Sequence, residues 1–410
     1  MQSKYLRELE PGFTPVTICE EAARCLLCHD APCSKACPAG TDPAKFIRSV
    51  RFRNFKGAAE TIRESNVFGS VCARVCPTEK YCQQACSRCG IDKPIDIGRI
   101  QRYVTDFEET LGMKILNKPE KKLGKSVAVV GGGPGGLTAA AELLKLGYDV
   151  EVFEKEAELG GYLRYGIPEY RLPNHIVDVE IQRIVDLGLV VHTGVKVGKD
   201  IDFAELKQKF DAVVVGIGYS QSKWLPMFEG NAYAEPAASF LRRAKESRGE
   251  LELPQNVLVI GGGDASMDVC TTLKLLGVKN VTAVVRREFD NFRASQKELA
   301  DARAQGVSIY DGYAPVAVEG NTVTFEHRAV KSTIRYTADK IILAVGQTLD
   351  AEGLHLTFDH EEANSDNFRV ADSNVFVVGD ISKNEEKTVV GAVRSGKLVA
   401  ERIHTYLGGE

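Results

Sequence analysis

Cysteines are concentrated near the start of the chain, in two blocks whose spacing could hold metal. The first block, at residues 25–40, reads CLLCHDAPCSKACPAG and spaces its cysteines as C-x2-C-x4-C-x3-C-P. The second block, at residues 71–90, reads VCARVCPTEKYCQQACSRCG and repeats the theme as C-x3-C-P-x4-C-x3-C. A zinc ion is satisfied by four thiolates, whereas ten cysteines lie between Cys19 and Cys89. Iron–sulfur clusters take several soft thiolates from compact loops, so the spacing favours two 4Fe-4S clusters.

The composition indicates a globular protein of the cytoplasm. The 410 residues are 44% apolar and 26% charged, which is enough for two or three domains with buried cores. No apolar run approaches the roughly 18 residues that span a bilayer, and the polar start, MQSKYLRELEPGF, does not resemble a signal peptide. A reducing cytoplasm argues against a disulfide framework. The formal charge of -4 argues against nucleic acid as the main partner.

The segment between the two cysteine blocks is expected to be helical. In DPAKFIRSVRFRNFKGAAETIRESNVFGS, at residues 42–70, apolar residues recur at helical spacing: Phe46, Ile47 and Val50, and then Ala58, Ala59 and Ile62. Two such helices would bring the cysteine blocks together. His29 is expected to face solvent or to support the site, because thiolates already supply the ligands.

A glycine-rich turn follows and opens a pattern of alternating strands and helices. The sequence KSVAVVGGGPGGLTAAAELLKLGYDVEVFEK, at residues 125–155, indicates a strand, a turn, a helix and a second strand. Gly131, Gly133 and Gly136 fit G-x-G-x-x-G, in which the absent side chains let the backbone approach a pyrophosphate at a helix N-terminus. Glu154 ends the second strand, where a carboxylate accepts hydrogen bonds from a ribose. We therefore predict a dinucleotide site.

A second unit of this kind is found at residues 256–288, NVLVIGGGDASMDVCTTLKLLGVKNVTAVVRRE. Gly261 and Gly263 keep the fingerprint, and Ser266 stands at the position of the third glycine. The second strand ends in Arg286 and Arg287 in place of an acid. Guanidinium groups suit a 2′-phosphate, which favours NADPH over NADH, although a pair of surface arginines would give the same sequence.

Two fingerprints imply two dinucleotides, and the later strands indicate how their domains are connected. DAVVVGIG at residues 211–218 and DKIILAVG at residues 339–346 are expected to be strands that end in glycine turns, and SNVFVVGDI supplies a late strand with Asp380. This order resembles the flavoprotein family of glutathione reductase, in which the NAD(P) domain is inserted into the FAD domain. The resemblance implies that the first fingerprint binds FAD and the second binds NAD(P)H. The expected fold is α/β, with a helical domain for two 4Fe-4S clusters followed by two Rossmann-like domains.

Members of that family that act on disulfides carry a redox-active C-x4-C after the FAD fingerprint. Here LGGYLRYGIPEYRLP, at residues 159–173, contains no cysteine, and Cys270 is expected to be a packed core residue. Electrons are therefore expected to pass to the iron–sulfur domain, because flavins convert hydride transfer into single-electron transfer. The expected boundaries are 1–118 for the iron–sulfur domain, 124–235 and 346–410 for the FAD domain, and 236–345 for the NAD(P) domain.

A cysteine domain joined to such a flavoprotein resembles the glutamate synthase small subunit and the N-terminal half of dihydropyrimidine dehydrogenase, over essentially the whole chain. The run Cys76-Pro77-x4-Cys82, and the glutamine at position 101 in PIDIGRIQRY, match the dihydropyrimidine dehydrogenase branch. By that resemblance one cluster is held by Cys25, Cys28, Cys33 and Cys86, and the other by Cys37, Cys76, Cys82 and Gln101. The remaining cysteines of the domain, Cys19, Cys72 and Cys89, become non-ligands.

The same resemblance assigns residues to the two dinucleotides. Those expected around FAD are Gly131, Gly133, Pro134, Gly135, Glu154, Lys155, Gly161, Leu163, Arg171, Gly379, Asp380 and Thr388. Those expected around NAD(P)H are Gly262, Gly263, Asp264, Ala265, Arg286, Arg287, Arg293, Ala344, Val345 and Gly346. No side chain is expected to be catalytic, because hydride transfer takes place at FAD. Bacterial members of the branch are described as using NADH, whereas the arginines favour NADPH, so both coenzymes stay open.

The resemblance implies an electron-input subunit. NAD(P)H would reduce FAD, and the two clusters would carry electrons to a partner that reduces uracil or thymine to the 5,6-dihydropyrimidine. Dihydropyrimidine dehydrogenase binds its pyrimidine at FMN in a (β/α)8 barrel, and too few residues follow Asp380 to form one. The expected partner is therefore an FMN-containing catalytic subunit in a heterotetramer, with neither nucleic acid nor membrane involved. The alternatives are an electron-supplying subunit of glutamate synthase or of a ferredoxin-linked reductase, and a cluster-bearing scaffold without activity.

Overall fold

The structure, a computed structural model, describes residues 4–371, 373–383 and 385–409. The chain forms two compact units. The larger unit contains Glu10–Arg164, Asn174–Tyr219 and Leu349–Glu410, and the smaller unit contains Met1–Leu9, Tyr165–Pro173 and Ser220–Thr348. None of the helices in the described part of the chain has both the length and the hydrophobicity of a membrane span.

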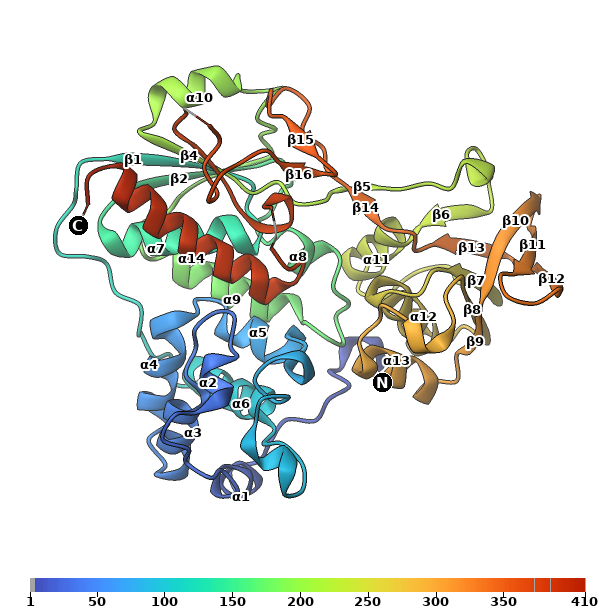
Figure 1. Cartoon of the computed structure of the whole chain (residues 1–410), viewed down its shortest axis with the longest axis horizontal. Helices are drawn as coiled ribbons and strands as arrows, with labels where there is room; N and C mark the ends of the chain where they lie inside the picture. Colours follow the sequence, from blue (N-terminus) through green and yellow to red (C-terminus); the bar gives the residue numbers. More distant parts are fainter. Residues whose placement is uncertain (1–3, 372, 384, 410) are drawn as a thin grey trace. The chain divides into compact units, whose positions relative to one another are not determined.

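The first part of the larger unit is helical (Figure 1). Its helices are α1 (Thr17–Ala23), α2 (Pro32–Lys35), α3 (Pro43–Arg51), α4 (Phe55–Ser65), α5 (Gly69–Val75) and α6 (Ile97–Thr110). Asp42, Asn54 and Asp96 begin α3, α4 and α6 by accepting hydrogen bonds from backbone N–H groups. The predicted apolar faces of α3 and α4 are buried and share one core with α6. This confirms the helices predicted between the cysteine blocks.

The second part of the larger unit is a parallel sheet in the order β17-β4-β1-β2-β3. The strands are β1 (Ser126–Val130), β2 (Asp149–Glu154), β3 (Val190–Thr193), β4 (Ala212–Val215) and β17 (Val375–Val377). The helices of this part are α7 (Pro134–Leu146), α8 (Tyr162–Tyr165), α9 (Asn174–Val185), α10 (Phe203–Lys209) and α14 (Val389–Tyr406), with α7 and α14 on one face of the sheet and α10 on the other (Figure 1). Since β17 comes from near the end of the chain yet pairs with β4, the second dinucleotide domain is inserted into the first, as predicted.

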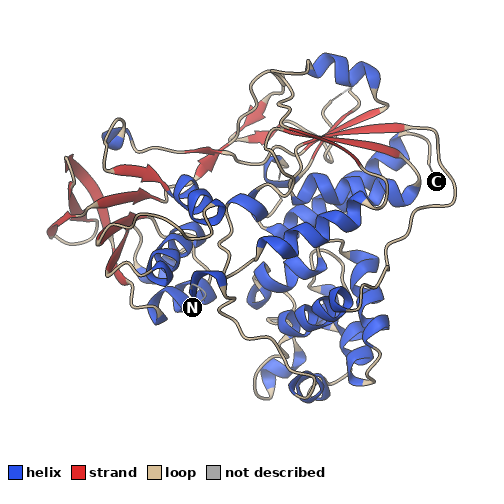
Figure 2. Cartoon of the chain, turned by 180° about the vertical axis from the view of Figure 1, so that it is seen from behind, coloured by secondary structure: helices blue, strands red, loops and turns tan. Residues whose placement is uncertain are grey.

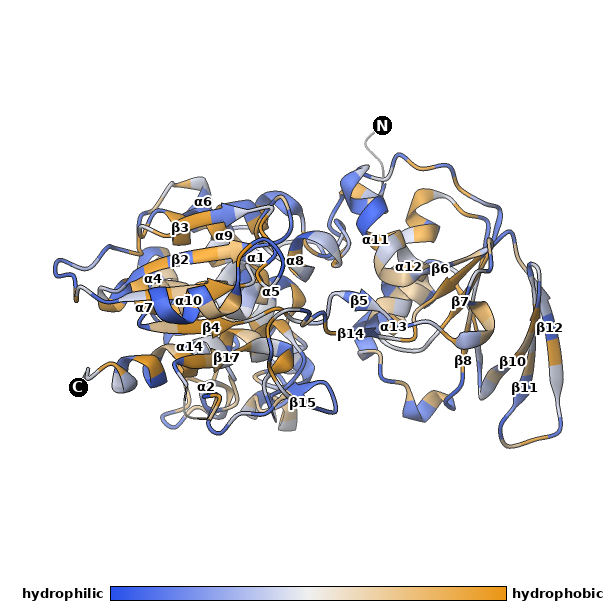
Figure 3. Ribbon diagram, turned by 90° about the horizontal axis from the view of Figure 1, so that it is seen from above, coloured by the Kyte–Doolittle hydropathy of each residue, from blue (hydrophilic) through white to orange (hydrophobic). Residues whose placement is uncertain are grey.

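The smaller unit is built around a second parallel sheet, in the order β6-β13-β7-β8-β9. Its strands are β6 (Ala234–Pro236), β7 (Asn256–Ile260), β8 (Asn280–Val285), β9 (Ser308–Asp311) and β13 (Lys340–Leu343). The helices that accompany it are α11 (Ala237–Glu246), α12 (Asp264–Leu276) and α13 (Gln296–Ala304) (Figure 2). Residues of β7 and α12 belong to one buried core, and β7 is among the most hydrophobic segments in Figure 3. Cys270, on α12, is fully buried in this core, which confirms its expected role.

Two additions extend the smaller unit beyond a plain Rossmann-like fold. An antiparallel sheet, β10 (Tyr313–Glu319), β11 (Thr322–His327) and β12 (Thr333–Thr337), follows β9. The N-terminal turn Lys4–Leu6 also belongs to this unit, where Tyr5 is fully buried beside Tyr170 and Leu275. Short strands β5 (Gln221–Ser222) and β14 (Gln347–Thr348) pair where the chain enters and leaves the unit.

The compact units differ in extent from the domains expected from sequence. The helical domain, expected to be separate, shares one unit with the first dinucleotide fold. The chain passes into the inserted unit after Tyr219 and leaves it after Thr348, whereas the sequence pattern puts these points after residues 235 and 345. The early start arises because β5 and β6 pair with strands of the inserted unit, β14 and β13.

Candidate functional site

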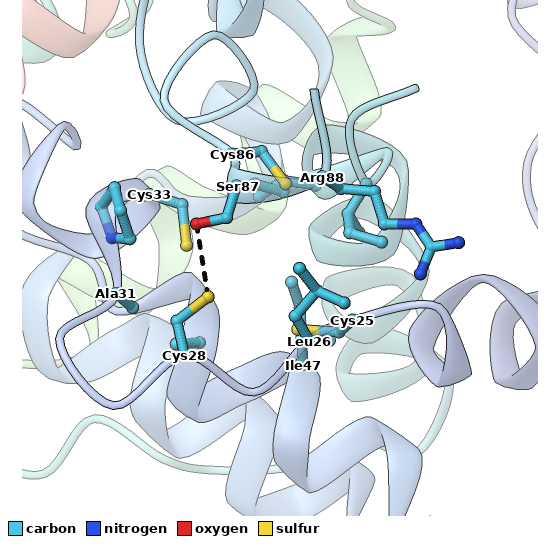
Figure 4. A pocket seen from close by; sticks show the side chains of 13 residues that line it. Cys25, Leu26, Cys28, Ala31, Cys33, Ile47, Cys86, Ser87 and Arg88 are labelled. Atoms are coloured by element: carbon cyan, nitrogen blue, oxygen red, sulfur yellow. Dashed lines mark hydrogen bonds between the residues drawn. The ribbon is translucent and has the colours of Figure 1, made fainter. Parts of the chain in front are cut away.

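Four of the predicted cluster ligands line one cavity in the helical domain (Figure 4). Cys25, Cys28, Cys33 and Cys86 border a space of about 370 Å³ that is partly open to solvent. The other lining residues are Leu26, Ala31, Pro32, Ala44, Ile47, Ser87, Arg88, Ile95 and Ile97. The Cys28 thiol donates a hydrogen bond to Ser87 Oγ at 3.4 Å. The fold thus brings Cys86 to the first cysteine block across a large sequence separation.

A second group of thiols contains Cys37, Cys76 and Cys82, and Cys72 joins it. Cys76 lies near enough to the other three for their charge to raise the pKa of its thiol, after the larger effect of burial. Gln101, on α6, is buried, and its Nε2 donates a hydrogen bond to the Gly69 carbonyl at 2.7 Å. Gly69 begins α5, the helix that carries Cys72 and ends at Cys76. Gln101 is therefore held beside the helix that carries Cys72 and is followed by Cys76.

The three cysteines expected to be non-ligands have different surroundings. Cys72 is buried within the second group. Cys19 is partly buried against the helical core. Cys89 is exposed, and its thiol donates to the Gln83 carbonyl at 3.3 Å.

Burial affects the pKa of two of the grouped thiols, Cys33 and Cys82. It raises the pKa of Cys33 to about 11 and that of Cys82 to about 12, and neighbouring thiols add to both shifts. Bound iron reverses this preference, because metal-ligating thiols lose their protons. In the described residues, no three Cys, His, Asp or Glu side chains converge closely enough for a single metal ion. The four cysteines of the first group border a common space, which is the arrangement that a multinuclear cluster needs.

A buried ion network connects the helical domain to the first dinucleotide fold. Arg63 of α4 lies between two carboxylates, with Nη2 at 2.8 Å from Glu108 Oε2 of α6 and 2.6 Å from Glu180 Oε1 of α9. Glu180 Oε2 also accepts a hydrogen bond from Ser70 N, near the start of α5, at 2.9 Å. A separate contact joins Tyr81, which stands between two grouped cysteines, to Glu386. Both contacts therefore join the second thiol group to elements of the first dinucleotide fold.

The first glycine turn has the geometry of a dinucleotide site. A Cβ at Gly131, where φ is +103°, would lie 2.4 Å from the Gly216 carbonyl oxygen, and one at Gly136 would lie 2.2 Å from that of Gly131. At Gly133 a Cβ would meet no atom within 4 Å. Gly133 caps α7, whose first residues are Pro134 and Gly135. The outer glycines are thus required by packing, while the middle one keeps the helix N-terminus open to a ligand.

Glu154 is fixed beside this turn. It is buried at the end of β2, and its two carboxylate oxygens accept hydrogen bonds from Gly132 N at 2.7 Å and from Glu156 N at 2.9 Å. Burial raises its pKa, and the two backbone bonds oppose that shift. The carboxylate therefore stands where an acid meets a ribose in such folds.

Of the other residues expected around FAD, all but Arg171 belong to the larger unit. Gly161 packs against Gly133, Leu163 is buried, Lys155 forms an ion pair with Asp350 at 3.6 Å, and the segment after β17 carries Gly379, Asp380 and Thr388. Burial raises the pKa of Asp380, and Lys387 opposes the shift. Arg171 belongs to the smaller unit, where it forms ion pairs at 2.7 Å with both Asp268 and Glu298.

The second glycine turn repeats the first with one substitution. A Cβ at Gly261 would lie 2.3 Å from the Ala344 carbonyl oxygen, and one at Gly263 would meet no atom within 4 Å. Ser266 is fully buried, and its Oγ donates to the Gly261 carbonyl at 2.8 Å. In the first turn the equivalent carbonyl, that of Gly131, packs against Gly136. In the second turn the Ser266 hydroxyl forms a hydrogen bond with that of Gly261 instead. The further residues expected around NAD(P)H lie in or near this turn. Gly262 is part of the turn, Asp264 and Ala265 begin α12, and Ala344, Val345 and Gly346 follow β13.

Arginines follow β8, at the position where Glu154 ends β2 in the first fold. Arg286 and Arg287 follow β8, and the backbone of Arg293 donates to the Gly262 carbonyl at 3.2 Å. Asp264 holds the same loop by accepting from Ser295 N at 2.7 Å. Burial and then the positive charges of Arg293, Arg286 and Arg328 lower the pKa of Arg287.

Comparison with known proteins identifies the family. Residues 2–113 match the model described as dihydropyrimidine dehydrogenase domain II, 4Fe-4S cluster, and residues 125–396 match the pyridine nucleotide-disulphide oxidoreductase model. The chain is 53% identical to the NAD-dependent dihydropyrimidine dehydrogenase subunit PreT of Escherichia coli (strain K12), over 100% of this chain and 98% of that relative. The chain belongs to the PreT family. It is an oxidoreductase with a 4Fe-4S domain and an FAD-dependent pyridine nucleotide domain.

More distant proteins place this family in a wider group. The chain is 30% identical to the glutamate synthase [NADPH] small chain of Azospirillum brasilense, over 97% of this chain and 91% of that relative. Among solved structures, FprA of Mycobacterium tuberculosis in complex with NADPH has a TM-score of 0.59 at 16% identity, covering 69% of this chain and 84% of that one. Thioredoxin reductase of Lactococcus lactis has a TM-score of 0.55 at 20% identity, covering 69% and 99%. These two likenesses support the expected fold of the paired dinucleotide domains.

Sequence reasoning missed the residues that join distant segments. Glu180 and Tyr81 carried no spacing signal, because their partners are 117 and 305 positions away. Arg328 was missed because only the pairing of β10 with β11 brings it to the second fold's arginines. One signal was available for Arg63, since this charged residue stands four positions after Ala59 and so lies on the predicted apolar side of α4.

Proposed function

We propose that this chain is the electron-input subunit of a cytoplasmic dihydropyrimidine dehydrogenase. It takes electrons from NAD(P)H and delivers them to an FMN-containing, PreA-type partner, which reduces uracil or thymine to the 5,6-dihydropyrimidine in a heterotetramer. The full-length similarity to proteins named as subunits of that enzyme supports the proposal. FAD, when bound, supplies the change from hydride to single-electron transfer, and two 4Fe-4S clusters supply the path onward.

Each of these groups is assigned its own set of side chains in this protein. One cluster falls to Cys25, Cys28, Cys33 and Cys86, and the other to Cys37, Cys76, Cys82 and the amide of Gln101. The open turn at Gly133 receives the FAD pyrophosphate, and Glu154 receives its ribose. Arg171 is assigned to FAD by family resemblance, and its ion pairs with Asp268 and Glu298 fix the position of its guanidinium group.

One observation carries the proposal more than any other. The helical domain and the first dinucleotide fold form one compact unit, joined by the buried Arg63–Glu180 ion pair at 2.6 Å. Electron transfer between FAD and a cluster requires that the two be held in fixed proximity. A cluster-bearing scaffold has no such requirement, so this joint favours an electron-transfer subunit.

The arginines after β8 support NADPH as the coenzyme. A phosphate contact from a guanidinium group is worth roughly 1.5 to 3 kcal/mol, which corresponds to about ten- to a hundredfold in affinity. Arg286 therefore discriminates in favour of a 2′-phosphate. The names of the PreT relatives state NAD dependence and therefore favour NADH. The affinities of this protein for NADH and NADPH should be compared directly.

The decisive experiment adds the partner. Protein loaded with iron, sulfide and FAD without oxygen should reduce ferricyanide with NAD(P)H by itself. It should oxidise NAD(P)H in response to uracil only after the FMN-containing subunit is added. Cys37→Ala should lose about half of the bound iron and abolish the uracil-dependent rate, while FAD stays bound, because two clusters have separate ligand sets.

Cys89→Ser is the matched control, since Cys89 is the exposed cysteine of the same domain. It should keep both the iron and the coupled rate. Uracil-dependent oxidation by the isolated chain, at a rate that the partner does not raise, would refute this division of labour. Coupling to a glutamate synthase large subunit in its place would favour the alternative.

A further inference from the structure

Two consecutive residues of α14 contact the first glycine turn and the first cysteine block. A Cβ at Gly396 would lie 2.6 Å from the Gly135 carbonyl oxygen, so this part of α14 packs directly against the start of α7. The next residue, Lys397, extends to the helical domain, where its Nζ donates a hydrogen bond to the Ala39 carbonyl at 2.8 Å. All of these residues belong to the larger unit. One helix therefore connects the turn expected to bind FAD with the segment that carries Cys37.

The segment that receives Lys397 is a tight turn that begins at Cys37. The Gly40 N–H donates to the Cys37 carbonyl at 3.0 Å, which closes the turn. Ala39 is buried within it, and Gly40 has a φ of +71°. A Cβ at Gly40 would lie 3.6 Å from Lys397 Nζ, so the lysine lies over this end of the turn. The ammonium group is thus fixed against the backbone that carries a predicted ligand of the second cluster.

Lys397 brings a positive charge that no carboxylate pairs with in the described part of the chain. It is partly buried, and among the residues that the structure describes it forms no ion pair. Glu142, on α7, pairs with Lys145 at 2.7 Å instead. Burial lowers the pKa of Lys397, and negative charge on other groups, Cys37 among them, opposes this shift. A cation withdrawn from water without a partner is unfavourable, and a thiolate-bound iron–sulfur cluster would supply the missing negative charge.

We propose that Lys397 is a positioning residue that raises the reduction potential of the second cluster, the one assigned to Cys37, Cys76, Cys82 and Gln101. Its hydrogen bond to Ala39 holds the Cys37 turn, and its charge favours the state of the cluster that has gained an electron. That electron comes from NAD(P)H by way of FAD, and its arrival adds one negative charge without forming or breaking a bond. This inference rests on the proposed function and gives a residue of the FAD-binding fold a role at a cluster.

A redox titration of the cofactor-loaded, full-length protein without oxygen, followed by electron paramagnetic resonance, tests the proposal. The signal that is missing in Cys37→Ala identifies the second cluster. Lys397→Met should make reduction of that cluster about tenfold less favourable, which is a potential lower by about 59 mV for one electron. The iron content and the potential of the first cluster should not change.

Three further variants separate charge from hydrogen bonding. Lys397→Arg keeps the charge and should restore most of the potential. Lys397→Gln keeps a donor without the charge and should lower the potential as Lys397→Met does. Lys56→Met is the matched control, because Lys56 is an exposed lysine of the helical domain that pairs with Glu60 at 3.7 Å. It should leave both potentials unchanged.

An unchanged potential of the second cluster in Lys397→Met would overturn the inference. So would a normal potential in Lys397→Gln, because the lysine would then act only through its hydrogen bond. If Lys397→Met does not retain the second cluster, the potential measured in Lys397→Gln decides. Failure of the proposed function gives a different result: the unmodified protein would show no 4Fe-4S signals, or NAD(P)H would reduce neither cluster.

Discussion

Two arginines, the buried Arg63 and the partly buried Arg171, attach extra segments to the two dinucleotide folds, and their networks differ in charge balance. Arg63 attaches the helical domain to α9, and its partners Glu108 and Glu180 are also met by Arg183, at 2.5 Å from Glu108. That network contains two arginines and two glutamates. Arg171 attaches Tyr165–Pro173 to α12 and α13 through ion pairs at 2.7 Å with both Asp268 and Glu298. The second network therefore has one carboxylate in excess.

The excess charge is removed by a proton. Burial raises the pKa of Glu298 to about 8, because desolvation outweighs the attraction of Arg171 and because Asp268 adds repulsion. Glu298 is thus largely protonated at neutral pH while it still contacts the guanidinium group. The comparison shows two outcomes for an arginine between two acids. With a second arginine the charges are balanced and the network joins two segments; without one, an acid of the network titrates near physiological pH.

The largest expected effect comes from breaking the balanced network. Arg63→Ala leaves two buried carboxylates with one arginine, and should lower the free energy of unfolding by about 3–5 kcal/mol. Urea unfolding of the cofactor-loaded protein measures this loss. Arg48→Ala, on the exposed side of α3, is the control and should change stability by less than about 0.5 kcal/mol. A loss below about 1 kcal/mol for Arg63→Ala would mean that the network does not join the domains.

Arg171→Ala should have a smaller effect, of about 2–3 kcal/mol, because the protonated Glu298 leaves Asp268 as the main uncompensated charge. The same urea experiment, on samples of equal flavin content, gives the comparison directly. Equal losses of unfolding free energy in Arg63→Ala and Arg171→Ala would contradict the proposed difference in charge between the two networks.

A further expected effect concerns the pH dependence of stability. Glu298 has a pKa of about 8 in the folded chain and an ordinary value of 4.5, so between these values the folded state holds a proton that the unfolded state has lost. Stability from this group therefore falls as pH rises, by up to about 1.4 kcal/mol per pH unit. Glu298→Gln should remove this dependence of stability on pH between about pH 5 and about pH 8. A variant whose stability follows pH as the unmodified protein does would contradict the assignment of the proton to Glu298.

Local patterns allowed much of the fold and part of the site to be predicted. The glycine turns at Gly131 and Gly261 were readable because a strand, a turn and a helix occupy adjacent residues. The thiol groups were readable in outline, since short spacings constrain loops, but the assignment of Cys86 to the first group needed family resemblance. The compact units cross at points other than the predicted boundaries, because the pairing of β5 with β14 joins residues 125 positions apart, Ser222 and Gln347. Arg328 and Glu180 depend in the same way on long-range pairing that no local pattern records.

Synthesis on the ribosome is constrained by the way the chain alternates between the two units. It crosses from one to the other after Leu9, Arg164, Pro173, Tyr219 and Thr348. The N-terminal turn with Tyr5 is made first, yet its neighbours on α12 emerge only after most of the larger unit has been translated. The larger unit in turn lacks β17 and α14 until the last part of the chain is made. Neither unit is a contiguous stretch of polypeptide: the smaller unit is complete only once Thr348 has been made, and the larger unit only once α14 has been made.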